Sequence, residues 1–182
     1  MADLGVFYKS ESSEWETPKF LLDPIERFMG VIDLDPSSNI GPDYLVPAKH
    51  HFTIEDNGLT QKWFGRVFVN PPWSKKERKP IKLWTEKCLY EYRIGNVEEL
   101  LLLVPARPDS GWYIPLKNFA EVSLHKRVNF EVAGQSLNNA PFSTSLVYMG
   151  KRLAALQEVF GSIGTVRVPY KLVMDLVENG EI

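Results

Sequence analysis

A strand–helix–strand pattern between residues 65 and 105 constrains the fold of this chain more than any other feature. Residues 65–69 end in the apolar run Val67-Phe68-Val69 and are predicted to form a strand. Residues 80–93 place apolar side chains on one face at helical spacing, and residues 100–104 are uninterruptedly apolar. A strand, a crossover helix and a second, wholly apolar strand indicate two parallel strands that are buried on both faces. The pattern predicts an α/β protein, and in such sheets ligands bind beyond the carboxyl ends of the strands.

The tetrapeptide Asn70-Pro71-Pro72-Trp73 follows the first of these strands and therefore stands at such a carboxyl end. The side-chain oxygen of Asn70 and the backbone carbonyl of Pro71 are two rigidly held acceptors, because proline has no N–H and a fixed φ. Together with the aromatic face of Trp73, they suit a flat amine such as the amino group of adenine, whose lone pair is delocalised into the ring. The alternative is that Pro-Pro merely ends the strand.

The region before the first predicted strand offers a second ligand site. Residues 18–28 are predicted to form an amphipathic helix with Thr17 as its N-cap and Pro18 at its first helical position. The free N–H groups of such a helix start attract a carboxylate. Residues 28–33 are predicted to form the strand that follows, and the glycine-rich turn of many cofactor folds is absent after it.

Acidic residues lie at the end of this predicted strand and in a later loop. Asp33 and Asp35 end the predicted strand, where a carboxylate can pair with an ammonium group of a ligand, although Asp-Pro is also ordinary turn chemistry. Asp56-Asn57-Gly58 predicts a tight turn within a polar stretch.

The second half of the chain contains further predicted strands. Residues 127–132 and 144–149 are separated by a polar stretch and predict an antiparallel hairpin that closes the sheet. Residues 151–182 carry no functional motif and are interpreted as a C-terminal extension. They are predicted to form a helix at 152–160, a turn at 161–164 and a strand at 166–168, with a further helix after the strand as an option.

Composition fits one soluble domain spanning residues 1–182, of which 44% are hydrophobic. No segment approaches the roughly 20 apolar residues that cross a bilayer. The first residues lack an export signal, so a cytoplasmic location is expected. The single cysteine, Cys88, forbids an internal disulfide and lies on the apolar face of the predicted helix. The three histidines lack the spacing of zinc ligands, and no metal is expected.

A basic run directly follows the acceptor tetrapeptide, although the net charge of the whole chain is only -2. Phosphate contacts by such residues position a nucleic-acid strand without reading its sequence. The alternative interpretation is a solvated loop. The residues of the run are Lys75, Lys76, Arg78, Lys79 and Lys82.

From about Trp15 to Gly150 the chain resembles the phage-type, Dam-like DNA N6-adenine methyltransferases. The resemblance rests on several pieces that occur in the family's order. They are Glu14-Trp15-Glu16-Thr17-Pro18, Asp33-Leu34-Asp35-Pro36, His51-Phe52-Thr53 with Gly58-Leu59 and Trp63, Asn70-Pro71-Pro72-Trp73, Leu103-Val104-Pro105-Ala106-Arg107 with Asp109 and Trp112, Lys126-Arg127-Val128-Asn129-Phe130, and Ala140-Pro141-Phe142. In two places the chain departs from the family: Asn57 replaces the usual Asp before Gly58, and Trp73 replaces the commoner Tyr.

The resemblance implies a Rossmann-like, S-adenosylmethionine-dependent fold with a mostly parallel sheet and an antiparallel hairpin at its C-terminal side. It implies DNA as the partner, with the target adenine flipped out, and direct methyl transfer without a metal; a monomer is the default expectation. The implied catalytic residues are Asn70, Pro71, Pro72 and Trp73. The implied cofactor-binding residues are Trp15, Thr17, Pro18, Asp33, Asp35, Ser37, Asp56 and Asn57. The implied DNA-binding residues are Lys75, Lys76, Arg78, Lys79 and Arg107.

Several alternatives stay open at the level of sequence. The same acceptor tetrapeptide serves enzymes that methylate an amino group of adenine in RNA, of cytosine in DNA or of glutamine in protein, because each presents a planar NH2. Carbon methylation of cytosine is disfavoured because it requires an exposed cysteine nucleophile, whereas Cys88 is expected in the core. A non-catalytic DNA-binding module with the same fold is the alternative from a different class.

Overall fold

The computed structural model describes residues 16–39, 45–73, 81–132, 135–136 and 142–181. The helices and strands of these ranges are α1 Lys19–Met29, β1 Ile32–Asp35, β2 Ala48–His51, β3 Gly65–Val69, α2 Ile81–Arg93, β4 Val97–Pro105, the 3-10 helix η2 Ile114–Asn118, β5 Ala120–Leu124, β6 Glu131–Val132, β7 Gln135–Ser136, β8 Thr144–Met149, α3 Leu153–Phe160, β9 Gly164–Arg167 and α4 Tyr170–Glu178.

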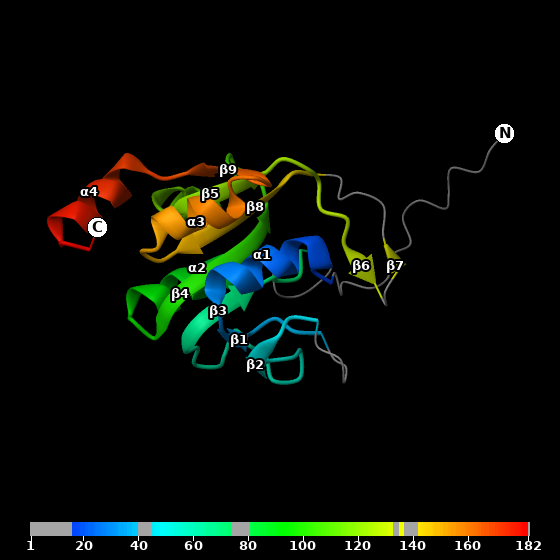
Figure 1. Cartoon of the computed structure of the whole chain (residues 1–182). Helices are drawn as coiled ribbons and strands as arrows, with labels where there is room; N and C mark the ends of the chain where they lie inside the picture. The colour runs from blue at the N-terminus through cyan, green and yellow to red at the C-terminus, as the bar shows by residue number, and fades with distance from the viewer. Residues whose placement is uncertain (1–15, 40–44, 74–80, 133–134, 137–141, 182) are drawn as a thin grey trace.

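The described strands form a seven-stranded sheet in the order β2-β1-β3-β4-β8-β5-β9, and β6 pairs with β7 in a separate small ribbon (Figure 1). The junctions from β2 to β4 are parallel. The junctions from β4 to β9 are antiparallel. The chain is thus an α/β protein, as predicted, but its sheet is mixed rather than mostly parallel.

The strand–helix–strand prediction is confirmed. β3 and β4 lie side by side and parallel, with Val69 opposite Leu102, and α2 connects them. Every residue from Leu100 to Pro105 is buried, which explains why this strand lacks any polar alternation.

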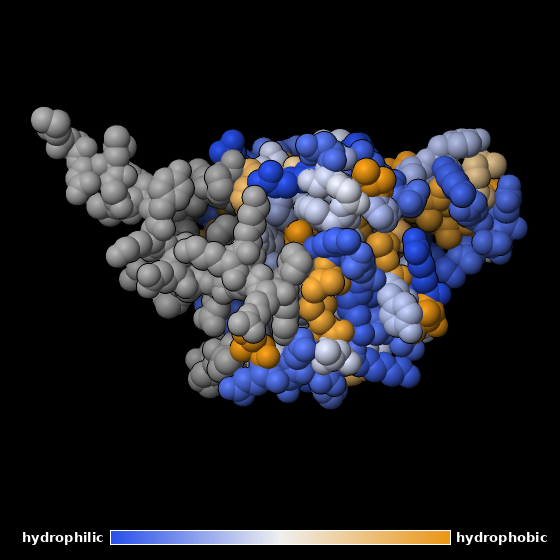
Figure 2. Space-filling model, turned by 180° about the vertical axis from the view of Figure 1, so that it is seen from behind, coloured by the Kyte–Doolittle hydropathy of each residue, from blue (hydrophilic) through white to orange (hydrophobic). Residues whose placement is uncertain are grey.

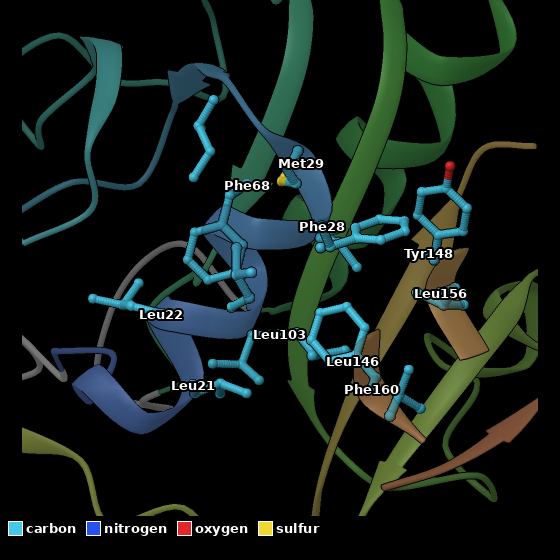
Figure 3. Packing of buried hydrophobic residues seen from close by; sticks show 14 of the residues in the cluster. Leu21, Leu22, Phe28, Met29, Phe68, Leu103, Leu146, Tyr148, Leu156 and Phe160 are labelled. Carbon is cyan, nitrogen blue, oxygen red and sulfur yellow. The ribbon is translucent and has the colours of Figure 1, made fainter. Parts of the chain in front are cut away.

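Helices cover both faces of the sheet and divide the core in two. On one face, α1 and α3 bury their apolar sides against Phe68, Leu103 and Leu146. Figure 3 shows this packing, in which the rings of Phe28 and Tyr148 meet edge to face at 5.0 Å. On the other face, α2 packs on the alternate residues of β3 and β4. Seen from behind, the surface interleaves hydrophilic and hydrophobic residues (Figure 2).

The first predicted strand is displaced in the structure. Residues 28–33 were expected to form it, but α1 continues to Met29, Gly30 caps the helix with a φ of 70°, and β1 begins at Ile32. The reason is packing, because Phe28 and Met29 complete the buried face of α1. The strand consequently ends at Asp35, and this moves the carboxyl end of β1 by two residues.

The predicted antiparallel hairpin is also wrong in one of its two strands. Strand β8 forms as predicted, but its partners are β4 and β5, whereas only Glu131–Val132 of the predicted strand 127–132 pairs, and it pairs with β7. Strand β5 was not predicted, because it contains a buried carboxylate, that of Glu121, and therefore lacks a hydrophobic pattern. This side chain accepts hydrogen bonds from Tyr113 (2.8 Å) and Ser145 (2.7 Å).

The segment after β8 follows its prediction with small shifts of boundary. The helix predicted at 152–160 is α3, and the strand predicted at 166–168 is β9, which pairs with β5 at the end of the sheet. Strand β2, at the opposite end, was not predicted, because its sequence Ala-Lys-His-His is mostly polar and exposed.

Candidate active site

Asn70 lies directly beyond β3 and joins three segments of the chain. Its backbone N–H donates to the Ser37 hydroxyl at 3.2 Å, and its side-chain Nδ2 donates to the Thr17 hydroxyl at 3.1 Å. Ser37 follows β1, the neighbour of β3 in the sheet, and Thr17 precedes α1. The structure therefore brings the predicted catalytic amide together with two of the predicted cofactor-binding residues.

Asp35 extends this arrangement at the end of β1. Its carboxylate is buried and accepts hydrogen bonds from the Ser37 N–H at 3.0 Å and the Ser37 hydroxyl at 3.2 Å. Burial raises the pKa of Asp35, because removing a carboxylate from water disfavours its charged form, while the hydrogen bonds from the serines oppose this effect. A buried carboxyl with a raised pKa is poised to gain from a cationic partner.

Asp33, the other acidic candidate, is directed elsewhere. Its carboxylate accepts the Arg66 N–H at 2.9 Å and pairs with Lys49 Nζ at 2.9 Å. These contacts, first the backbone hydrogen bond and then the lysine, lower its pKa. Arg66 is the second residue of β3, whereas Asn70 follows the other end of this strand, so the structure does not bring Asp33 to the Asn70 amide.

Thr17 and Pro18 take roles that differ from the predicted helix start. Pro18, not Thr17, is the N-cap of α1; it has extended backbone angles and its carbonyl accepts the N–H groups of Leu21 and Leu22 at 2.9 and 3.1 Å. No side chain caps this helix. The Thr17 hydroxyl is directed to Asn70 instead.

The turn that contains Asp56 and Asn57 packs beside the end of β1. Asp56 accepts hydrogen bonds from the Thr53 N–H at 2.8 Å and the Thr53 hydroxyl at 3.0 Å, and these bonds lower its pKa. Asn57 has a positive φ of 58°, a conformation that asparagine tolerates better than most residues. Gly58 touches the backbone of Pro36, which places this turn next to the Asp35 loop.

Replacing Gly58 by alanine is expected to push these two loops apart. The new β-carbon would overlap the Pro36 carbonyl oxygen, and backbone cannot swing aside as a flexible side chain does. We expect a loss of about 1–3 kcal/mol in the free energy of unfolding, as overpacking typically costs, measured by chemical denaturation. Gly111→Ala is the matched control, because a β-carbon there meets nothing within 4 Å. Equal stability of the two variants would contradict this contact.

Trp73 sits in an aromatic cluster that sequence reasoning missed as a unit. Its ring meets Phe130 edge to face at 4.8 Å and lies 5.5 Å from Phe142. The guanidinium of Arg107 lies over the Phe142 ring at 5.5 Å, so this predicted DNA-binding residue is held beside the cluster and is exposed. Phe130 and Phe142 were part of the family pattern, but nothing in the sequence indicated that they contact Trp73.

The remaining predicted positions divide in two. Pro71 is buried and Pro72 half-buried, directly after Asn70. Trp15, Lys75, Lys76, Arg78 and Lys79 lie outside the described residues.

Cys88 is fully buried on the inner side of α2, which confirms its predicted place in the core. Burial raises the pKa of its thiol, and a neutral buried thiol cannot serve as the nucleophile that carbon methylation requires. Across the described ranges, no group of three or more His, Cys, Asp or Glu side chains is arranged to hold a metal ion. No helix in those ranges has the length and apolarity needed to cross a membrane.

Comparison with known proteins identifies a family for this chain. The family model described as DNA N-6-adenine-methyltransferase (Dam) matches residues 6–176. The match extends beyond the expected limits of about 15 and 150, and it includes α3, β9 and most of α4. No curated protein and no solved structure matches the chain.

The mixed seven-stranded sheet with its four described helices is consistent with a methyltransferase-like fold. A side-chain amide lies beyond a buried parallel strand, a buried carboxyl lies near it, and the family match covers nearly the whole chain. The chain belongs to the DNA N-6-adenine-methyltransferase (Dam) family, and it is an adenine-specific DNA methyltransferase.

Proposed function

We propose that this sheet works as in a Rossmann-like fold and that methyl transfer to adenine takes place at the edge formed by the carboxyl ends of β1 and β3. The observation that supports this most strongly is the continuous hydrogen-bonded chain Thr17–Asn70–Ser37–Asp35. It joins a group suited to the substrate amine with a group suited to a cationic cofactor. Two reactants held at one edge in fixed orientation is what an in-line displacement requires.

Asn70 and Pro71 act on the substrate in this proposal. The amino nitrogen of adenine is a poor nucleophile until its hydrogens are drawn away from the ring plane. The side-chain oxygen of Asn70 and the carbonyl of Pro71 accept those two hydrogens, and Trp73 stacks on the base. Preorganised acceptors of this kind stabilise charge as it develops in the transition state.

The cofactor proposed for this edge is S-adenosylmethionine, which supplies a methyl group on a sulfonium when bound. The donor set fits it, since a carboxylate suits its ammonium and a helix start suits its carboxylate. We assign the ammonium to Asp35 with Ser37 and the carboxylate to the start of α1 at Pro18. The turn of Asp56 and Asn57, packed beside the Asp35 loop, is assigned to the cofactor's adenine.

DNA is proposed to approach from the side of the aromatic cluster. Arg107 is exposed there, and the basic run from Lys75 to Lys79 follows Trp73 in sequence. These cations position the phosphates, while the target adenine is rotated out of the helix at a cost of roughly a few kcal/mol in unstacking. One copy of the chain contains every group in this scheme, so a monomer suffices.

Replacing Asp35 by asparagine tests the cofactor assignment. We expect the dissociation constant for S-adenosylmethionine, measured by isothermal titration, to rise about tenfold or more, because a charge-assisted hydrogen bond contributes roughly 1.5–3 kcal/mol.

The same replacement is expected to change how the stability of the cofactor-free protein depends on pH. The raised pKa means that the folded state holds the Asp35 proton to higher pH than the unfolded chain, so wild-type stability falls as pH rises through that window. The variant lacks this fall.

Asp33→Asn is the matched control for this experiment. Asp33 pairs with Lys49 and the start of β3, so its replacement is expected to leave cofactor affinity unchanged. The reverse result, with affinity lost in Asp33→Asn and kept in Asp35→Asn, would move the ammonium site to Asp33.

A further inference from the structure

The catalytic role proposed for Asn70 depends on which end of its amide faces the substrate. A side-chain amide has one accepting end, the oxygen, and one donating end, the nitrogen. Of these two ends, only the oxygen can accept a hydrogen from the adenine amine and draw it out of the ring plane. Rotation of the amide by half a turn would present N–H groups to an amine that needs an acceptor.

In the structure, the amide nitrogen of Asn70 faces Thr17. The threonine hydroxyl accepts the hydrogen bond from Asn70 Nδ2 at 3.1 Å, which directs the oxygen of the amide away from Thr17. Thr17 is only 4% exposed, so water does not readily replace the hydroxyl as a partner for the amide. The helix start does not take this hydroxyl either, because Pro18 is the N-cap of α1 and no side chain caps the helix.

A second contact holds the backbone of the same residue. The Asn70 N–H donates to Ser37, which is itself hydrogen-bonded to the buried Asp35 carboxylate. The backbone of Asn70 is thus held by the loop after β1, and its amide nitrogen is held by the segment before α1. The threonine and the asparagine are 53 positions apart in the sequence, so the contact is made by the fold alone.

We propose that Thr17 is a positioning residue for methyl transfer, which acts through Asn70 and holds its amide oxygen towards the substrate amine. The inference rests on the function proposed above for Asn70. A positioning role and a cofactor-binding role for Thr17 predict different results. In a positioning role, loss of the hydroxyl lowers the rate of methylation at saturating cofactor and leaves the affinity for the cofactor intact.

The test replaces Thr17 by valine, which keeps the shape and removes the hydroxyl. Tritium transfer from S-adenosylmethionine to adenine-unmethylated plasmid DNA gives kcat, and isothermal titration gives the cofactor's dissociation constant. We expect kcat to fall about 10- to 100-fold, the order that misorientation of a catalytic group produces, with cofactor affinity within twofold of wild type. Thr17→Ser keeps the hydroxyl, so this variant is expected to retain the hydrogen bond to Asn70 and a kcat within roughly a few-fold of wild type.

Each outcome decides the proposal. An unchanged kcat in Thr17→Val overturns it, as does a loss confined to cofactor affinity or a failure of Thr17→Ser to retain activity. Thr17→Ala removes the hydroxyl without placing a methyl group against the amide, and it replaces the valine variant if that one does not fold. If neither folds, Thr17 is structural and the proposal fails. Wild type that leaves adenine unmethylated would refute the proposed function itself, a result distinct from all of these.

Discussion

Asn70→Ala will lower the rate of adenine methylation by on the order of a hundredfold or more, as the removal of one preorganised acceptor does in other enzymes. The alanine variant keeps the Pro71 carbonyl but loses the oxygen that draws the amine out of plane. Cofactor affinity is expected to stay close to wild type, because Asp35 and Ser37 keep their own hydrogen bonds. Single-turnover methyl transfer at saturating S-adenosylmethionine measures the first quantity and isothermal titration the second.

Asn118→Ala provides the matched control for this loss. Asn118 is an exposed asparagine whose amide donates to the Pro115 carbonyl at 3.1 Å, at the end of η2. Its replacement removes the same side chain from a place without a catalytic role, and activity is expected to remain at the wild-type level. Full activity in Asn70→Ala would remove the acceptor mechanism from this site.

Glu99→Ala is expected to produce the largest loss of stability. Glu99 lies on β4, is 4% exposed and accepts hydrogen bonds from Tyr148 at 2.7 Å and from Arg152 at 2.5 and 3.0 Å. Alanine leaves a buried phenol and a half-exposed guanidinium without their acceptor. We expect a cost of about 3 kcal/mol, at the lower end for broken buried pairs because Arg152 can recruit water. This corresponds to a melting temperature roughly 6–12 °C lower.

The neighbouring Glu98 supplies the comparison. Its side chain is 66% exposed and lies 3.5 Å from Arg66, a surface ion pair of the kind that contributes about 0–1 kcal/mol. Glu98→Ala is therefore expected to melt within a few degrees of wild type, roughly 4 °C at most. Calorimetry that finds the two variants equally stable would show that the Glu99 network does not hold β4, β8 and α3 together.

The parts of the fold that sequence predicts well are those where one periodicity dominates. The apolar run of β4 and the one-sided pattern of α2 have no competing explanation, and their parallel arrangement fixed Asn70 at the carboxyl edge of the sheet. β5 was missed for the opposite reason. Glu121 points into the protein, where hydrogen bonds from Tyr113, Ser145 and Arg167, all outside β5, make that placement favourable.

The candidate site follows the same rule. Its acceptor tetrapeptide is contiguous and could be recognised in the sequence. The sequence alone did not distinguish Asp33 from Asp35, because the end of β1 depends on where α1 ends, which in the structure is Met29. The contact between Thr17 and Asn70 could not be predicted, because it joins two segments that are 53 positions apart in the sequence and because the N-cap of α1 is Pro18 rather than Thr17.

The burial of Cys88 has a practical consequence. It is the chain's one cysteine, and its protected thiol will react slowly with maleimide reagents in the folded protein. A cysteine introduced at an exposed position such as Gly111 would then carry a fluorophore at a single place, with the native residue left untouched. The wild-type framework is thus suited to following DNA engagement by fluorescence, without first engineering a cysteine-free background.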